Sequence, residues 1–203
     1  MEKTLIQLIK SRRSIRSYKN TSVPKEVLED IIQAGKFAPS AKNRQPWKFI
    51  VVTNKDLIQQ LSEKVKGFMR TVLKRRFLYQ WFEKSLRDER QVGFLAGMVL
   101  SNKDTIFHGA PAVVFIITKN AVYNDESCAC CAQNMMLAAH ALGIGSCWIG
   151  FAHYLDRKKQ TRQELGLPNG YHIAATLVFG HPEERPGKAQ IRRVDADVMQ
   201  WFE

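Results

Sequence analysis

An apolar run at residues 110–117 limits what this chain can form more than any other feature of its sequence. The run, which includes Pro111, is eight residues long, far short of the roughly 20 that a membrane-spanning helix needs. Continuous apolar character over such a length is typical of a strand buried on both faces. We therefore predict that residues 112–118 form a buried strand of a sheet.

Helical spacing of apolar residues appears on both sides of this strand. Residues 5–9 predict a short opening helix. A second helix begins around Pro24, a residue suited to the first helical turn, and it ends before Pro39 because the residue preceding a proline avoids helical geometry. A long helix at 127–142 follows the strand, with Gly143 as its C′ residue.

Shorter segments complete the predicted order of elements. They are a buried strand at 47–52, helices at 56–65 and within 66–104, short strands at 146–149 and 173–179, and a helix or arm at 195–202. Helices and strands alternate irregularly, so we expect the α+β class rather than a doubly wound sheet. Neither a Pro/Gly/Ser-rich linker nor an internal repeat divides the sequence, so residues 1–203 are predicted to form one domain.

The composition places the chain among ordinary folded proteins. Of its 203 residues, 45% are hydrophobic and 25% are charged. The N-terminus lacks the apolar h-region of an export signal. Three of the four cysteines crowd at Cys128, Cys130 and Cys131, which is not the pattern of a disulfide framework. We expect a cytoplasmic protein that does not span a membrane.

The chain is strongly basic, with 31 Lys and Arg against 19 Asp and Glu and a formal charge of +12. Residues 3–25 carry seven basic residues and no acidic one, residues 64–90 carry nine against three, and a third block lies at 185–193. Such a surface can bind nucleic acid, an anionic membrane or a phosphorylated small molecule, or it can be a solvated face. Zinc-finger, basic-zipper and RNP-like patterns are missing from the sequence. A basic nucleic-acid-binding module therefore stays only as an alternative of another class.

Three familiar site types do not fit the sequence. The Gly-x-Gly at 143–145 follows a helix and would place the third glycine of a dinucleotide fingerprint at Trp148. Cys128 and Cys131 share a helix face, but a zinc site would also need Cys147, and small thiols packed in a core are commoner. The sequence contains no nucleophile elbow. We expect neither a metal site nor hydrolytic machinery.

What remains is a distributed set of polar and glycine-rich segments. Arg12, Arg13, Ser14 and Arg16 put guanidinium and hydroxyl donors on the segment that leaves the first helix, which suits a phosphate. The loop at 39–47 carries two side-chain amides that can each donate and accept, as the edge of a heterocycle requires.

Two more segments follow later in the chain. Glycines at 143–150 let a flat ring approach the backbone, because glycine lacks Cβ. The segment 180–182, followed by Arg192 and Arg193, adds cationic donors. Each of the four segments alone is typical of a turn or of surface charge, whereas all four in this order are far more specific.

In this ordered set the sequence resembles the FMN-dependent nitroreductase family. The matching segments are RRSIRSY (12–18), FAPSAKNRQPWKFIVV (37–52), GAPAVVFI (109–116), CAQNMMLAAHALGIGSCWIG (131–150) and LVFGHPEERP (177–186). The resemblance implies an α+β fold with a central, mostly antiparallel sheet surrounded by helices. It also implies an interlocked homodimer with FMN at the subunit interface.

The resemblance assigns roles to the residues of these segments. Arg12, Arg13 and Ser14 would bind the FMN phosphate, and Arg16 would stabilise charge at N1 and O2 of the flavin. The segment 39–43 would come from the partner subunit. Its FMN contacts would be Pro39, Ser40, Ala41 and Asn43, and Gln45 would reach the ring.

The remaining cofactor contacts lie in the second half of the chain. The flavin N5 side would face Cys147, Trp148, Ile149 and Gly150. Arg192 or Arg193 would close over the phosphate. Lys188 is a reserve candidate, because Gln190 stands where the family has a Lys or Arg.

The function implied by the resemblance is that of an FMN-dependent oxidoreductase. NADH or NADPH would reduce FMN, and a nitroaromatic, a quinone or a similar small-molecule acceptor would then reoxidise it in a ping-pong reaction. Phe68, Phe77, Trp81 and Phe82, in the variable helical segment 66–104, would line the substrate pocket or pack a dimer helix. Reductive dehalogenation and flavin breakdown on the same fold are the alternatives within the family.

Overall fold

A four-stranded sheet forms the centre of the computed structural model, which describes residues 4–79, 81, 84–184 and 199–202. The sheet order is β1-β2-β4-β3, and each neighbouring pair is antiparallel. The strands are β1 (Lys48–Val52), β2 (Ala112–Lys119), β3 (Gly145–Trp148) and β4 (Tyr171–Gly180). The predicted α+β fold with a mostly antiparallel sheet is confirmed.

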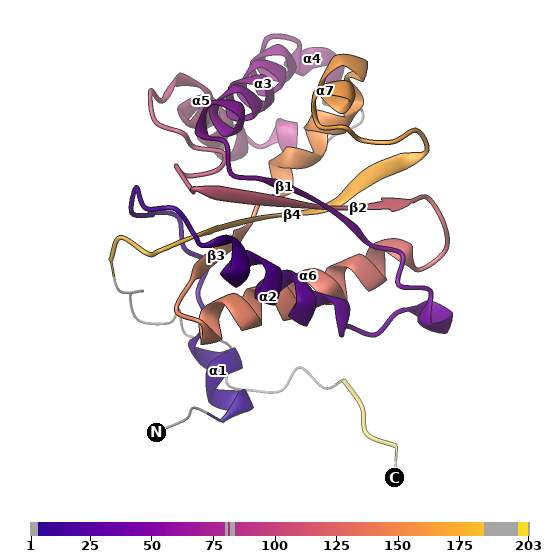
Figure 1. Ribbon diagram of the computed structural model, residues 1–203. Coiled ribbons are helices and arrows are strands. Elements are labelled where there is room, and N and C mark those ends of the chain that lie inside the picture. The colour runs from indigo at the N-terminus through magenta and orange to yellow at the C-terminus, as the bar shows by residue number, and fades with distance from the viewer. Residues whose placement is uncertain (1–3, 80, 82–83, 185–198, 203) are drawn as a thin grey trace.

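Helices cover both faces of this sheet (Figure 1). On one face lie α2 (Lys25–Lys36) and α6 (Asn124–Ala141), with α1 (Leu5–Ser11) beyond them. The other face carries α3 (Lys55–Lys74), α5 (Glu89–Leu100), α7 (Lys159–Glu164) and the 3-10 helix η3 (Gly150–Arg157). Three short pieces complete the order: η1 (Ala41–Asn43), α4 (Arg76–Tyr79) and η2 (Lys84–Arg87).

The strand predicted from the apolar run separates two hydrophobic cores. Val113 and Phe115 of β2 pack into the core under α3, whereas Val114 and Ile116 pack into the core under α6. Side chains of a strand alternate between its two faces. A strand between two helical layers must therefore be apolar where both faces are covered, as β2 is from Ala112 to Ile117.

The prediction of a fully buried strand at 47–52 is wrong for part of β1. Lys48 is exposed, and Val51 keeps 43% of its surface accessible. The physical reason is position, since β1 is bonded to β2 alone and forms an edge of the sheet. An edge strand needs apolar side chains only where a helix covers it.

Helix ends follow the expected capping chemistry, but one helix is longer than predicted. The Asn54 side chain accepts a hydrogen bond from the Leu57 N–H (2.9 Å) and begins α3. The helix continues past residue 65 to Lys74, because Val65 and Met69 extend its buried face. After α6, Gly143 adopts a left-handed φ of 75°, as a C′ glycine does. None of the described helices is both long and apolar enough to cross a bilayer.

Candidate cofactor site

The basic segment after α1 lies along strand β3. Ser14 forms a parallel bridge with Ser146, and the Ile15 N–H donates to the Ser146 carbonyl (3.0 Å). Gly145 makes this approach possible, since a Cβ there would lie 3.0 Å from the Ile15 side chain. The segment thus adds a short extra pairing at the β3 edge, which places its arginines beside that strand.

Two guanidinium nitrogens of this segment are buried without a partner. Arg13 Nη1 donates to the carbonyls of Lys10 and Arg12, both at 2.7 Å. Arg12 Nη1 and Arg13 Nε have no hydrogen-bond partner among the residues that the structure describes. A buried cationic donor left unpaired is costly. Guanidinium donors match phosphate oxygens in geometry and charge, so this donor set fits a phosphate group.

Strand β3 brings the other predicted residues of the basic segment together around Cys147. The Cys147 thiol is buried, and burial raises its pKa. Arg16, the Ser14 hydroxyl and Arg12 oppose that rise, so all three lie close to the sulfur. Residues more than 130 positions apart in sequence therefore share one small region at the end of β3.

The backbone after β3 alternates between buried and accessible positions. Trp148 is 38% exposed and Gly150 is also exposed, whereas Cys147 and Ile149 are buried. A Cβ at Gly150 would meet no described atom within 4 Å, which leaves room for a flat ring. The Ile149 N–H donates to the Thr176 carbonyl (2.9 Å) and belongs to the sheet. The Gly150 carbonyl, one residue later, accepts a hydrogen bond from the His153 ring Nδ1 (2.5 Å).

The loop at 39–45 is strained and firmly held. Lys42, Asn43 and Gln45 have φ values of 54°, 51° and 47°, a left-handed region that non-glycine residues seldom adopt. The Gln45 N–H donates to the Ser40 Oγ (3.0 Å), and the Gln45 amide donates to Asn43 Oδ1 (3.2 Å). Pro39, Asn43 and Gln45 are exposed, while Ser40 and Ala41 are half-buried. Such strain persists where surrounding contacts over-determine the backbone, and it is common at functional sites.

Within one chain the basic segment and this loop do not meet. Ser11, next to Arg12, contacts His140 in the last turn of α6 (2.8 Å). Ala41 donates to the Ser127 Oγ in the first turn of the same helix (3.4 Å). At 1.5 Å per residue the two anchor points lie about 20 Å apart along α6. The two predicted halves of the site therefore lie at opposite ends of this helix.

The structure describes three of the four aromatics predicted for the substrate pocket. Phe68 stacks on Tyr154 of η3, with ring centroids 4.4 Å apart, and Arg157 lies over both rings. Phe77 and Trp81 are each 73% exposed. Phe82, Lys188, Arg192 and Arg193 fall outside the described residues, as does the first half of the 195–202 segment.

The cysteines occupy both cores. Cys128 and Cys131 pack between α6 and the sheet, whereas Cys147 belongs to the opposite core. Burial raises the pKa of Cys128 to about 11 and that of Cys131 to about 12, so both stay protonated at neutral pH, unlike the thiolates that bind zinc. Among the described residues no group of three His, Cys, Asp or Glu side chains is placed to hold a metal.

Sequence reasoning missed His108. The structure places this residue half-buried and near enough to Arg16 for that guanidinium to lower its pKa, an effect second to burial. The only local signal was the His-Gly pair just before the apolar run.

Comparison with known proteins assigns the chain and its fold to a family. The sequence pattern of the Nitroreductase family matches residues 9–181. A protein of Archaeoglobus fulgidus named "Putative NADH dehydrogenase/NAD(P)H nitroreductase" is 30% identical over 183 residues, which cover 88% of this chain and 86% of that protein. A nitrobenzene nitroreductase of Ectopseudomonas oleovorans is 26% identical over 193 residues, covering 85% of this chain and 84% of its own.

Solved structures agree with the sequence match. The crystal structure of a nitroreductase with bound FMN from Bacteroides fragilis superimposes with a TM-score of 0.77 at 26% identity, and the match covers 100% of both chains. One assignment follows from the shared sheet, from the arginine segment beside β3 and from the 173 matched residues (9 to 181). This chain belongs to the Nitroreductase family.

Proposed function

We propose that this protein is an FMN-dependent NAD(P)H oxidoreductase that acts as a homodimer on nitroaromatic, quinone or similar small-molecule acceptors. The observation that carries the proposal is the pair of buried, unpartnered nitrogens at Arg12 and Arg13. A phosphate placed there removes the cost of two unpaired cationic donors. Two relatives are named as nitroreductases, and a related crystal structure is that of a nitroreductase with bound FMN. Both point to the same cofactor.

This proposal assigns a role to each residue near the end of β3. Arg12 and Arg13 hold the phosphate, together with the Ser14 hydroxyl, and Arg192 or Arg193 closes over it. Arg16 donates to the N1–O2 edge of the flavin and stabilises negative charge there without changing its own protonation. Gly150 leaves the space in which the flat ring lies. When bound, FMN supplies the hydride chemistry at N5.

A second copy of the chain completes the site. The 39–45 loop lies at the far end of α6 from Arg12, so in the homodimer the partner's loop reaches the flavin instead. Asn43 and Gln45 are exposed and free to approach a neighbouring chain. Their amides supply the donor and acceptor groups that a heterocycle edge needs. The strain stored in this loop keeps them in a fixed orientation.

The electron donor and acceptor use the same face of the ring in turn. Ping-pong kinetics follow, because NAD(P)+ must leave before the acceptor enters. Basic side chains in the 64–90 segment attract the anionic nicotinamide cofactor, and Phe68, stacked on η3 just beyond Gly150, is the best-placed aromatic for an acceptor. The proposal places the enzyme in the cytoplasm.

Purification under native conditions, followed by anaerobic assays, tests this function. We expect visible flavin absorbance, or its appearance on adding FMN, with bleaching by NADH or NADPH and recovery with nitrobenzene or a quinone. Initial rates at several acceptor concentrations should give parallel double-reciprocal lines. Recovery only with a halogenated aromatic, or consumption of the flavin itself, would assign the alternative chemistries. A colourless protein that FMN does not reconstitute, and that binds DNA with a steep salt dependence, would overturn the proposal.

A further inference from the structure

His108 adopts a backbone conformation that histidines seldom adopt. It lies between α5 and β2 with a φ of 58°, and it is half-buried. A non-glycine residue in this left-handed region costs on the order of 1 kcal/mol, and it persists only where neighbouring contacts enforce it. Contacts of this kind hold the backbone on both sides of His108.

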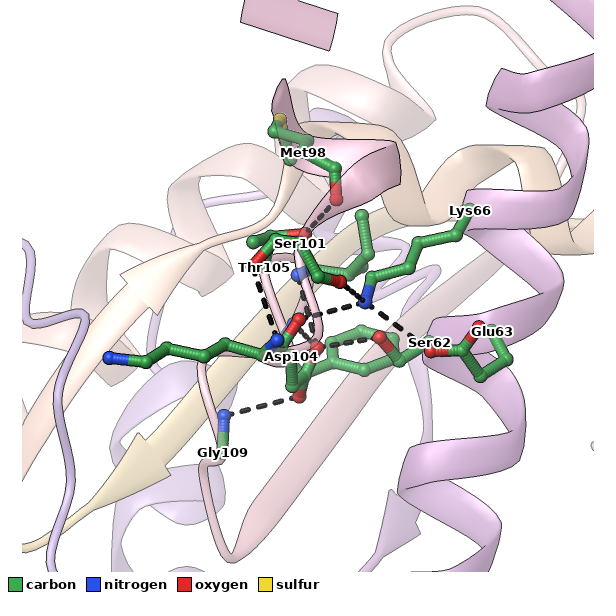
Figure 2. Close-up of polar contacts among 11 residues, drawn as sticks. Ser62, Glu63, Lys66, Met98, Ser101, Asp104, Thr105 and Gly109 are labelled. Atoms are coloured by element: carbon green, nitrogen blue, oxygen red, sulfur yellow. Dashed lines mark hydrogen bonds and ion pairs between the residues drawn. The ribbon is translucent and has the colours of Figure 1, made fainter. Parts of the chain in front are cut away.

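His108 lies in a turn whose backbone amides are held by the Asp104 carboxylate, and Figure 2 shows the bonds of Asp104 to Ser62 and Gly109. It accepts one hydroxyl and three amide hydrogen bonds, from Ser62 Oγ (2.5 Å), Ile106 N–H (3.0 Å), Phe107 N–H (3.0 Å) and Gly109 N–H (3.1 Å). Of the three backbone amide donors, two precede His108 in the sequence and one follows it directly. The backbone on both sides of the imidazole is therefore fixed by one side chain.

Lys66 ties the beginning of the same loop to α3 (Figure 2). Its ammonium donates to the carbonyls of Ser101 (3.1 Å) and Lys103 (2.7 Å) and forms an ion pair with Glu63 (3.3 Å). Only 3% of Lys66 is exposed. A buried charge with this many partners makes a rigid anchor, so the 101–109 loop holds His108 in one place.

That place is next to the arginine segment. Gly180 has no room for a side chain, because a Cβ there would lie 2.6 Å from Pro111 Cδ and 2.7 Å from Tyr18 Cδ1. Pro111, three residues after His108, and Tyr18, two residues after Arg16, therefore lie side by side at the end of β4. Arg16 is close enough to influence the titration of the imidazole.

The imidazole of His108 is neutral at physiological pH. Burial lowers its pKa below the ordinary value of 6.5, and the Arg16 guanidinium lowers it further, while Asp104 acts in the opposite direction. Tyr18, also on the adjacent segment, stays a neutral phenol because burial raises its pKa. A neutral imidazole carries one proton and offers its other nitrogen as an acceptor.

We propose that His108 is a further FMN-binding residue, whose imidazole accepts a hydrogen bond from N3–H of the flavin while Arg16 donates to the adjacent N1–O2 edge. The pyrimidine edge presents an acceptor, a donor and an acceptor in turn. A guanidinium has five donors and no acceptor, so within one chain Arg16 cannot accept from N3–H, whereas the neutral His108 imidazole can. This inference rests on the proposed FMN site and deepens it.

The proposal makes FMN affinity depend on pH in a stated direction. Above the lowered pKa of His108 the acceptor is present. Below it the imidazole becomes a donor, carries a charge beside Arg16, and repels N3–H. FMN affinity therefore falls as the pH drops through the lowered pKa of His108. The FMN phosphate also titrates near pH 6, but its contribution is the same in the wild type and in any His108 variant.

Binding titrations of the apoprotein dimer test the assignment without an activity assay. The probes are FMN and its N3-methyl analogue, which lacks the N3–H, followed by flavin fluorescence at pH 8 and at a pH below the lowered pKa of His108, which an NMR titration of the imidazole locates. We expect the wild type to prefer FMN by about tenfold at pH 8, the equivalent of one unmade hydrogen bond, and to lose most of that preference at the lower pH.

Two variants separate this role from a structural one. His108→Gly suits the left-handed backbone, and it should bind both flavins alike at both pH values. His108→Asn also tolerates this backbone and carries an acceptor that does not titrate, so it should remove the pH dependence of the preference. His172→Gln is the matched control, because His172 pairs with Asp125 at the start of β4, and it should behave as the wild type does.

The outcomes distinguish this inference from the proposed function. If His108→Gly binds FMN tightly but discriminates between the two flavins as the wild type does, the role of His108 is overturned while the FMN site stands. If neither the wild type nor the variants bind FMN, the proposed function fails and the inference fails with it.

Discussion

The hydroxyl of Ser11 lies 2.8 Å from Nε2 of His140, a contact that joins the end of α1 to the last turn of α6. The Ser11 hydroxyl also lies within hydrogen-bond distance of the Leu8 carbonyl (3.2 Å). No residue of α1, all of which are described, is buried. The position of Arg12 therefore depends on this contact and on the pairing of Ser14 with β3.

Removing the Ser11 hydroxyl should weaken FMN binding more than it weakens the fold. We expect Ser11→Ala to raise the dissociation constant of FMN about fivefold, the cost of roughly one hydrogen bond, and to change the urea midpoint little. Thr71→Ala is the control, since the Thr71 hydroxyl bonds only to its own helix at the Gly67 carbonyl (3.0 Å). Equal affinities for the two variants would contradict this role.

The Asp104 carboxylate should be one of the most important polar groups for stability. Asp104→Ala strips the acceptor from four donors at once, so we expect a loss of about 3 kcal/mol in the free energy of unfolding. Asp88→Ala removes the N-cap of α5, where the side chain accepts from the Arg90 N–H (2.9 Å), and should cost about 1 kcal/mol. Urea denaturation of both variants measures the difference. A similar cost for both would mean that the 101–109 loop is not held as described.

A methyl group should have opposite effects at two helical glycines. At Gly35 a Cβ would lie 2.5 Å from Met135 Cγ and 3.0 Å from Cys131 Sγ, where α2 meets α6. Gly35→Ala should therefore destabilise the protein by about 1–3 kcal/mol. At Gly67 nothing described lies within 4 Å, so Gly67→Ala should stabilise it by about 0.5–1 kcal/mol. Thermal unfolding gives the sign, and a stabilised Gly35→Ala variant would show that the two helices pack less closely.

Arg16 and Lys19 provide a matched test of charge in the site. Both residues are exposed and lie on one segment, but Arg16 lies close enough to Cys147 and His108 to lower their pKa values, whereas Lys19 donates its backbone N–H to the His181 carbonyl. Arg16→Ala should lower flavin affinity or the rate of flavin reduction about tenfold or more, the cost of a charged hydrogen bond. Lys19→Ala should change neither by more than about twofold. Rapid-mixing reduction by NAD(P)H measures both, and equal effects would remove the role assigned to Arg16.

Much of the fold could be predicted because its signals are local. The apolar run at 112–118 predicts β2, since successive residues such as Val113 and Val114 enter opposite cores. The exposure of Val51 could not be predicted, because an edge strand and a central strand differ only in what lies beside them. The true end of α3 was missed because packing at Met69, rather than a local stop signal, extends the helix.

The candidate site divides in the same way. Arginine, serine and glycine types in sequence order predict the segment beside β3, which the structure assembles at Cys147. The sequence could not show that Ser40 lies at the far end of α6 from Arg12, since this depends on how two loops pack on one helix. The role of His108 could not be predicted for a related reason. Its left-handed backbone depends on Asp104, which in turn accepts a hydrogen bond from Ser62 of α3.

The central claim is an FMN site built from two chains, and mixed dimers test it most directly. One chain carries Arg12→Ala and Arg13→Ala. The other carries Asn43→Gly and Gln45→Gly, which keep the left-handed loop. Each variant alone should bind FMN weakly, because both of its sites lack one half.

In the mixed dimer one site combines both damaged halves, and the other combines both intact halves. Co-expression with two different tags isolates this species, and a fluorescence titration counts its sites. The account predicts one FMN per two chains, bound with wild-type affinity. A mixed dimer that binds no better than either variant alone would contradict it, because the arginine segment and the loop would then serve the same flavin from a single chain.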